Sequence, residues 1–137
     1  MRGSERFTQR ASTAITKAHD AAMGMGHSYV GTEHLLLGII REGEGLGARI
    51  LTDNALTDAV LTRMVTETVG RGVPGAPEQG LSPRARHVIE LAAEDANRLG
   101  HCYVGTEHIL MGILREADSA GARIICLLYT SDAADDL

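Results

Sequence analysis

The stretch GHSYVGTEHLLLGIIRE at residues 26–42 returns almost unchanged as GHCYVGTEHILMGILRE at residues 100–116. The match extends outward without a gap, so that residues 7–51 align with residues 81–125 at a constant offset of about 74. About half of the aligned positions are identical, which indicates a tandem duplication. The chain of 137 residues therefore contains two copies of one small structural unit.

Each copy begins with the pattern of an amphipathic helix. Apolar residues recur with a helical period at Ala11, Ile15, Ala18, Ala22 and Met25, and again at Ala85, Ile89, Ala92, Ala96 and Leu99. Because both stripes consist mostly of alanine, a neighbouring helix must approach closely. Thr8 and Ser82 stand at the expected N-cap positions, and Gly26 and Gly100 stand where a left-handed C-terminal cap is expected.

A second helix is predicted to start at Thr32 and at Thr106, each as an N-cap residue. Glu33 or Glu107 follows in the first turn, where a carboxylate meets the positive end of the helix dipole. These helices contain an internal glycine, Gly38 or Gly112, which costs about 1 kcal/mol relative to alanine. Close contact with the preceding helix is the expected reason.

Two shorter helices complete the first copy in this interpretation. A third helix is expected around residues 48–51 and, in the second copy, around residues 122–125. Thr57 is predicted to cap a fourth helix in the first copy. Its inward face would consist of Val60, Leu61, Met64, Val65 and Val69. Each copy is therefore built for about four helices.

The segment GRGVPGAPEQG at residues 70–80 combines glycine, proline and polar residues without periodicity, as linkers do. We therefore divide the chain into a first repeat at residues 5–69, a linker at residues 70–80 and a second repeat at residues 81–125. No strand-like alternation is found, so the predicted fold class is all-α, with two pseudo-symmetric four-helix repeats packed on one another.

The last residues, CLLYTSDAADDL at 126–137, do not continue the repeat. They resemble the translation of a transposase adapter used in preparing sequencing libraries, and we expect them to be a read-through artefact that packs poorly. The second repeat would then lack its last helix. This loss is expected to uncover apolar surface around Ile109, Leu110 and Ile113.

Composition excludes several classes of function. Thirteen basic against eighteen acidic residues give a net charge of −5, which disfavours nucleic acid as a partner. Lys17 is the only lysine, and no phosphate-binding G-x-x-x-x-G-K-[ST] loop is present, so this chain alone is not expected to hydrolyse ATP. Apolar runs are too short for a membrane span and no signal core is found, so we expect a cytoplasmic protein without membrane partners. Cys102 and Cys126 lack C-x-x-C spacing, and Cys102 is expected to be a small, partly buried side chain.

A repeated histidine and glutamate constellation is the most chemical feature of the chain. His27, Glu33 and His34 recur as His101, Glu107 and His108. No H-E-x-x-H spacing is present, so no metal or other cofactor is predicted, and His34 and His108 are expected to be hydrogen-bonded near the core. A nucleophile elbow is also missing, so no catalytic residue is assigned.

The segments ERFTQRA, GHSYVGTEHLLLGIIREGEG, LSPRARHVIELA and GHCYVGTEHILMGILRE resemble the repeated amino-terminal domain of Clp-family AAA+ unfoldases, most closely the ClpC type. The resemblance covers residues 5–125 and implies two four-helix repeats. It also implies a domain that receives protein substrates and adaptor proteins and works with AAA+ ATPase modules of the same full-length protein. EADSAG at residues 116–121 departs from the EGEGLG of the first copy.

The resemblance further implies pockets that recognise arginine phosphorylated on its guanidinium. The matching glutamates here are Glu33 and Glu107, and Thr8 and Ser82 are our candidates for the helix start that meets the phosphate. From the residues alone, the favoured interpretation is that both glutamates are first-turn residues that only offset the helix dipole. The resemblance makes the phosphoarginine interpretation its equal.

The leading hypothesis is therefore a non-enzymatic recognition domain of a ClpC-like unfoldase acting in regulated proteolysis. One alternative is an independent protein-binding module without an ATPase. The other, from a different class, is a small hydrolase or metal enzyme.

Overall fold

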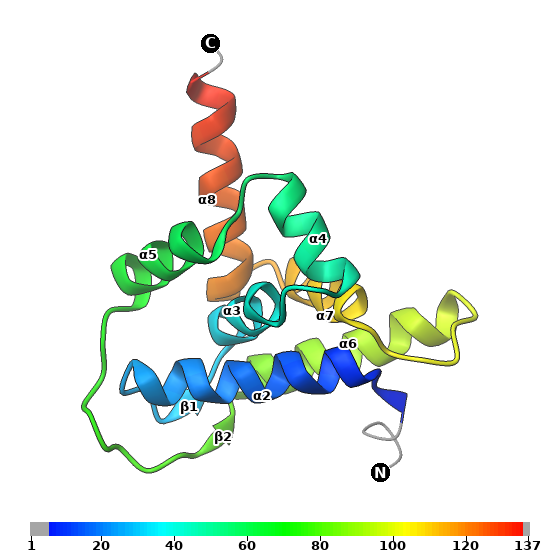
Figure 1. Ribbon diagram of the computed structural model, residues 1–137, viewed down its shortest axis with the longest axis horizontal. Coiled ribbons are helices and arrows are strands. Elements are labelled where there is room, and N and C mark those ends of the chain that lie inside the picture. Colours follow the sequence, from blue (N-terminus) through cyan, green and yellow to red (C-terminus); the bar gives the residue numbers. More distant parts are fainter. Residues whose placement is uncertain (1–5, 136–137) are drawn as a thin grey trace.

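The computed structural model describes residues 6–135, and the side chains of residues 6–128. Its helices are α2 (Gln9–Gly24), α3 (Thr32–Glu42), α4 (Leu46–Asp53), α5 (Asp58–Val69), α6 (Pro83–Arg98), α7 (Thr106–Arg115) and α8 (Ala120–Asp135). Figure 1 shows them as a helical assembly with α2 and α6 along one side and α8 projecting from it. The all-α prediction is confirmed. Within residues 6–135, no helix combines the length and apolar character needed to cross a bilayer.

The first two helices of each repeat pack very closely, α2 on α3 and α6 on α7. Glycine makes this approach possible in both pairs. A Cβ on Gly112 would lie 2.6 Å from the carbonyl oxygen of Val88, and a Cβ on Gly38 would meet the carbonyl oxygen of Ala14. The close helix contact predicted from the two internal glycines is therefore confirmed, and at matched positions.

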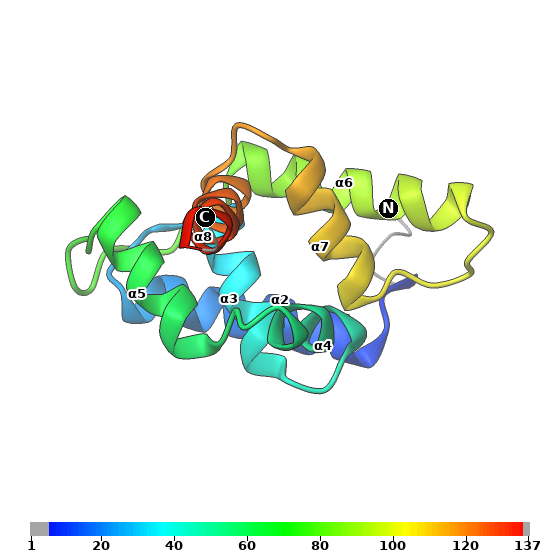
Figure 2. The ribbon, with the colours of Figure 1, turned by 90° about the horizontal axis from the view of Figure 1, so that it is seen from above.

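The two repeats are interlocked rather than placed side by side. Helix α4 of the first repeat packs on α7 of the second, and α8 packs on α3 (Figure 2). The N–H of Gly47 donates to the hydroxyl of Thr106 at 2.9 Å, and the N–H of Gly121 donates to the hydroxyl of Thr32, also at 2.9 Å. Each repeat thus supplies backbone donors to the other.

Two short strands add to this interlock and were not predicted. β1 (Tyr29–Val30) pairs in parallel with β2 (Gly80–Leu81), so that the end of the linker lies against the first repeat. A single bridge joins Phe7 to Val104 in the related position. Alternation cannot reveal pairs of this length, because two residues contain no repeat of the period.

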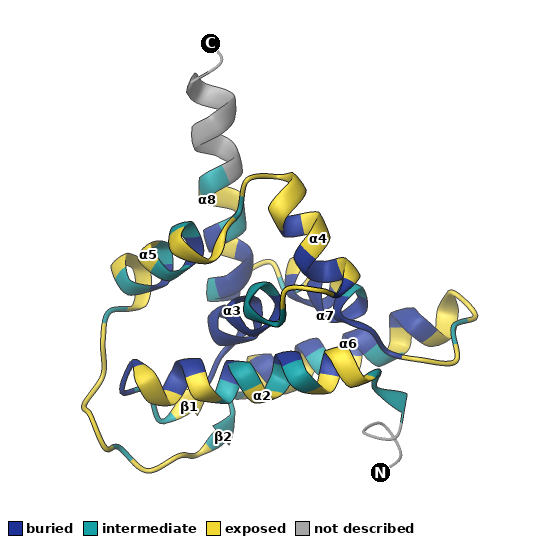
Figure 3. Cartoon of the chain, in the orientation of Figure 1, coloured by how far each residue is buried: buried dark blue, intermediate teal, exposed yellow. Residues whose placement is uncertain are grey.

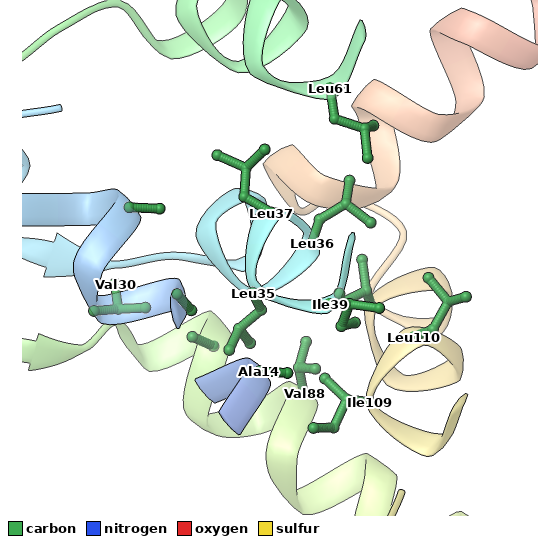
Figure 4. Close-up of a cluster of buried hydrophobic side chains, with 14 of the residues drawn as sticks. Ala14, Val30, Leu35, Leu36, Leu37, Ile39, Leu61, Val88, Ile109 and Leu110 are labelled. Atoms are coloured by element: carbon green, nitrogen blue, oxygen red, sulfur yellow. The ribbon is translucent and has the colours of Figure 1, made fainter. Parts of the chain in front are cut away.

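The hydrophobic core lies between the repeats, and α3 runs through it. Leu35, Leu36, Leu37 and Ile39 of this helix are all buried, as the dark blue ribbon of Figure 3 shows. They point to different neighbours in Figure 4, with Leu61 of α5 lying over Leu36. Because most of α3 is buried in this core, the core fixes where its first turn lies in the surface described below.

Several local expectations are confirmed and others are corrected. The side chains of Thr8, Ser82 and Thr57 cap α2, α6 and α5 as predicted, and Gly26 and Gly100 have φ of 76° and 79°. The N-caps of α3 and α7 are Gly31 and Gly105, one residue before the predicted threonines. The threonine hydroxyls instead accept hydrogen bonds from the other repeat, which a local capping pattern cannot reveal. Val69, Leu99 and Cys102 are exposed, against expectation.

The third helix of the second repeat does not end near residue 125. Helix α8 continues as far as Asp135, so no structural break separates the second repeat from residues 126–135. Leu128 packs partly buried against the core, whereas Leu127 is exposed. Poor packing is therefore wrong for Leu128, and the side chains of residues 129–137 lie outside the described part of the chain.

The apolar surface of the second repeat also differs from the expectation. Ile109, Leu110 and Ile113 are buried, because they face α6 and the interface between repeats. The exposed apolar residues of α7 are instead Met111 and Leu114.

Candidate functional site

Three helix N-termini meet at a surface cleft around Glu33. The start of α3 contributes Gly31, Thr32 and Glu33, the start of α6 contributes Ser82 to Arg84, and α8 contributes Ala120. The cleft has a volume of about 670 Å³. We call it the Glu33 cleft.

A second cleft of about 230 Å³ surrounds Glu107 and is built in the same way. Its lining residues match the first set at the repeat offset: Thr8 for Ser82, Arg10 for Arg84, Tyr103 for Tyr29, Gly105 for Gly31, Thr106 for Thr32, Glu107 for Glu33 and Leu46 for Ala120. We call it the Glu107 cleft. The duplication has therefore produced two related clefts on one chain.

Each cleft takes residues from both repeats. Glu33 of the first repeat faces Ser82 of the second, while Glu107 of the second repeat faces Thr8 of the first. Backbone hydrogen bonds fix this crossing, because the N–H of Ser82 donates to Val30 at 2.9 Å and the N–H of Thr8 donates to Val104 at 3.0 Å. The structure thus brings together all four residues singled out in the sequence, in two crossed pairs.

Converging helix starts give each cleft an excess of donors. The first N–H groups of a helix have no partner within it, and the helix dipole places partial positive charge at the same end. Several such ends meeting at one cleft favour an anion. The exposed guanidinium of Arg84 adds a full positive charge beside Ser82, and Arg10 does so beside Thr8.

The two arginines differ in their surroundings. Arg10 lies 4.0 Å from the carboxylate of Glu42 and 3.9 Å from that of Glu44. Among the described residues, Arg84 has no carboxylate at ion-pair distance. The Glu33 cleft is therefore both larger and less neutralised than the Glu107 cleft.

The carboxylate of Glu33 lies close to the backbone of Gly31, at the start of the same helix. A Cβ on Gly31 would approach the carboxyl carbon of Glu33 to 2.8 Å, and the matched distance from Gly105 to Glu107 is 2.9 Å. Burial raises the pKa of the Glu33 carboxyl, opposed in part by a hydrogen bond to its own backbone and by the nearby His27. A buried carboxylate beside helix starts is an acceptor that a cationic donor group would stabilise.

A chain of hydrogen bonds holds the start of α3 from beneath. The N–H of Gly31 donates to Nδ1 of His34 at 2.9 Å, so His34 carries its proton on Nε2 and donates to Nδ1 of His27 at 2.7 Å. The proton of His27 then lies on Nε2, which donates to the carbonyl of Gly70 at 2.8 Å. This order of donors requires both imidazoles to be neutral. The structural role predicted for His34 is confirmed.

The same arrangement supports α7. Gly105 donates to Nδ1 of His108 at 2.9 Å, and His108 bonds His101 at 2.8 Å. His101 also stacks on Tyr103, with ring centroids 5.2 Å apart. The histidines therefore position the glutamate clefts and are engaged in fixed hydrogen bonds.

No group of three or more histidine, cysteine or acidic residues within the described chain is arranged to hold a metal ion. Arg10, Arg84, Tyr29 and Tyr103 are the cleft residues that the sequence reasoning missed. The sequence does contain a signal for them, because each recurs at the repeat offset. The two arginines stand two residues after the helix caps, and the two tyrosines stand two residues before Gly31 and Gly105.

Comparisons with known proteins agree with this architecture. The family model described as the Clp repeat (R) N-terminal domain matches residues 6–126. The chain is 43% identical over 120 residues to the negative regulator of genetic competence ClpC/MecB of Bacillus subtilis, and 42% identical over 122 residues to the chloroplastic chaperone protein ClpC of Pisum sativum. These matches cover 88% of this chain but only 15% and 13% of those relatives.

Solved structures give the same result for the fold. The N-terminal domain of the chaperone ClpD from Arabidopsis thaliana superposes with a TM-score of 0.74 at 27% identity, covering 90% of this chain and 87% of that one. The N-terminal domain of the ClpV1 ATPase from E. coli has a TM-score of 0.64 at 15% identity, covering 94% and 87%, and supports the fold alone.

Proposed function

Because the chain belongs to the Clp repeat N-terminal domain family, we propose that it is a recognition domain that binds protein substrates and adaptor proteins for a ClpC-like chaperone. The family domain is non-catalytic. The chain spans about 15% of the length of the ClpC/MecB relative, so the link to an ATPase engine and to regulated proteolysis is part of this proposal. Its ligand contacts would be made through the two glutamate clefts.

The finer proposal is that each cleft binds a phosphoarginine side chain. The observation that supports it is the pairing of a carboxylate with converging helix starts and an arginine, Glu33 with Ser82 and Arg84 in one cleft. The guanidinium nitrogens of the ligand would donate to the Glu33 carboxylate, a charge-assisted interaction. The phosphate would accept from the hydroxyl of Ser82, the first-turn N–H groups of α6 and the side chain of Arg84.

Selectivity follows from the two opposite charges. Arginine would satisfy the carboxylate but leave the helix starts without an anion, whereas phosphoserine would do the reverse. Both should therefore bind at least 10-fold more weakly, since losing one charged hydrogen bond costs about 1.5–3 kcal/mol. The Glu33 cleft should be the tighter of the two, because Arg10 is shared with Glu42 and Glu44, whereas none of the described carboxylates lies at ion-pair distance from Arg84.

Calorimetric titration of free phosphoarginine tests this function. Wild type would be compared with Glu33→Ala, with Glu107→Ala and with the double variant, and circular dichroism would establish that each is folded. Glu67→Ala, which removes an exposed glutamate of α5 outside both clefts, is the matched control. Each cleft variant should lose one class of site, the double variant both, and the control neither.

The outcome that would contradict the finer proposal is equally definite. Undiminished binding by a folded double variant, or no preference for phosphoarginine over arginine and phosphoserine, would leave both glutamates as helix-start residues. The broader proposal of a substrate and adaptor recognition domain would then depend on other surfaces of the two repeats.

A further inference from the structure

The Glu33 cleft is larger than the part of it that a phosphoarginine side chain would contact. Glu33, Ser82 and Arg84 are the residues assigned above to the guanidinium and the phosphate. The cleft volume of about 670 Å³ falls within the about 300–1,000 Å³ that is typical of sites for whole small molecules. A single side chain therefore leaves part of the cleft free, and the residues around that part determine what else can enter.

The remaining lining includes an apolar wall, where the end of α5 and the start of the linker lie close to β1. Val69 of α5 and Tyr29 of β1 both line the cleft, although they are 42% and 50% exposed. Gly26 and Gly72 line it with backbone alone. Figure 1 shows the linker leaving the end of α5 and returning to β2 beside β1. We call these four residues the Val69 wall, and none of them carries a charge.

Close backbone contacts hold the Val69 wall in place. The N–H of Gly72 donates to the carbonyl oxygen of Met25 at 2.9 Å, which docks the linker on the end of α2. A Cβ on Gly26 would lie 2.8 Å from the carbonyl carbon of Gly72, so the two backbones are in direct contact. The wall is therefore formed before any ligand arrives, and a ligand does not have to order it.

The same wall is tied to the helix start that carries the cleft carboxylate. The carbonyl oxygen of Gly70, the residue after Val69, accepts from Nε2 of His27 at 2.8 Å. His27 in turn accepts from His34, which accepts the N–H of Gly31 at the start of α3. This chain of hydrogen bonds fixes the position of the apolar wall relative to the carboxylate. A side chain next to a bound phosphoarginine would meet a surface of constant shape.

We propose that the Val69 wall binds an apolar side chain of the substrate, on the residue directly before or after the phosphoarginine. This inference rests on the function proposed for the Glu33 cleft and narrows its substrate class. An aliphatic neighbour buries exposed surface of Val69 and Tyr29, which is favourable. A polar neighbour of the same size loses hydration there without gaining a charged partner. Because aliphatic side chains are mostly buried in folded proteins, the cleft then favours marked arginines in unfolded segments.

Short peptides with one phosphoarginine are the probes. In one series the preceding residue is leucine, asparagine or glycine, in a second series the following residue is varied in the same way, and all other positions are glycine. Leucine and asparagine have similar shapes, so their difference reports apolar character rather than size. Calorimetric titrations would use the chain with Glu107→Ala, so that only the Glu33 cleft is measured.

Two valines provide the protein variants. Val69→Ser alters the wall at the last residue of α5, where the side chain is already partly exposed. Val73→Ser makes the same change at a linker valine that is 73% exposed and does not line the cleft. Circular dichroism and the affinity for the glycine peptides would establish that both variants keep a folded cleft.

We expect leucine on one side of the phosphoarginine to bind about 5-fold more tightly than asparagine, as partial burial of one aliphatic side chain implies. Val69→Ser should reduce this preference to about twofold or less, and Val73→Ser should leave it unchanged. Equal affinities for leucine and asparagine in both series, or a preference that Val69→Ser does not alter, would overturn the inference and leave the proposed function intact. If no phosphoarginine peptide binds, the proposed function is wrong and the inference fails with it.

Discussion

Neutral His34 beneath the Glu33 cleft makes the stability of the fold dependent on pH. Burial lowers the pKa of His34 from 6.5 to about 4, and the neighbouring His27 adds to the effect. Between pH 6.5 and about pH 4, the imidazole of His34 is therefore protonated in the unfolded chain but neutral in the folded chain. The contribution of neutral His34 to the free energy of unfolding is fully present above pH 6.5 and is lost as the pH falls toward 4.

The size of the loss follows from the shift. The whole interval corresponds to about 3 kcal/mol, and acidification from pH 7 to pH 5 should cost about 2 kcal/mol in the free energy of unfolding. Lowered pKa at His108 acts in the same direction. Glu33 acts in the opposite direction, because its raised pKa makes the folded state bind a proton more readily.

Urea denaturation at pH 7 and pH 5 measures this dependence. His34→Asn keeps an acceptor for the N–H of Gly31 but removes the titrating ring. Between pH 7 and pH 5, the free energy of unfolding of this variant should therefore fall by about 2 kcal/mol less than that of wild type. Leu99→Asn, at an exposed position that carries no titrating group, should retain the wild-type dependence. Equal pH dependence in wild type and His34→Asn would refute the assignment of a neutral, buried His34.

Four further substitutions test the packing by thermal or urea denaturation. Gly112→Ala should destabilise by about 1–3 kcal/mol, because the new methyl group would lie 2.6 Å from the carbonyl oxygen of Val88. Leu61→Ala should cost about 2–5 kcal/mol, since this side chain of α5 is fully buried where α5 packs on α3 and α8. Leu128→Ala should cost about 1–2 kcal/mol, whereas Leu127→Ala at the neighbouring exposed position should stay within about 0.5 kcal/mol. Equal effects for these two leucines would contradict the packing of α8.

The features that the sequence predicted are those determined locally or by the duplication itself. Caps at Thr8 and Ser82 depend on the residues next to them, and close packing at Gly38 and Gly112 follows from two glycines inside helical patterns. Helical class and repeat architecture needed only periodicity. The assignment of phosphoarginine to Glu33 and Glu107 stays a prediction.

What the sequence could not supply is the relation between the copies. A repeat offset shows which residues are equivalent, but not that Glu33 faces the cap of the other repeat. The hydroxyls of Thr32 and Thr106 were misassigned for the same reason, since their donors lie in the opposite repeat. The sequence also did not predict that α8 continues past residue 125, where Leu128 packs against a core assembled from distant segments.

The crossing of the repeats bears on how such a domain could arise. One cleft joins the start of α3 in the first copy to the start of α6 in the second, and the other joins the start of α7 in the second copy to the start of α2 in the first. A single repeat on its own would therefore contain only one side of each cleft and no complete cleft. An ancestor with a single copy could have made the same clefts only by pairing with itself around a twofold axis. Fusion of two such copies into one chain would then have replaced a dimerisation that depends on protein concentration with a covalent link between the repeats. It would also have freed the two clefts to diverge, as the different surroundings of Arg84 and Arg10 now show.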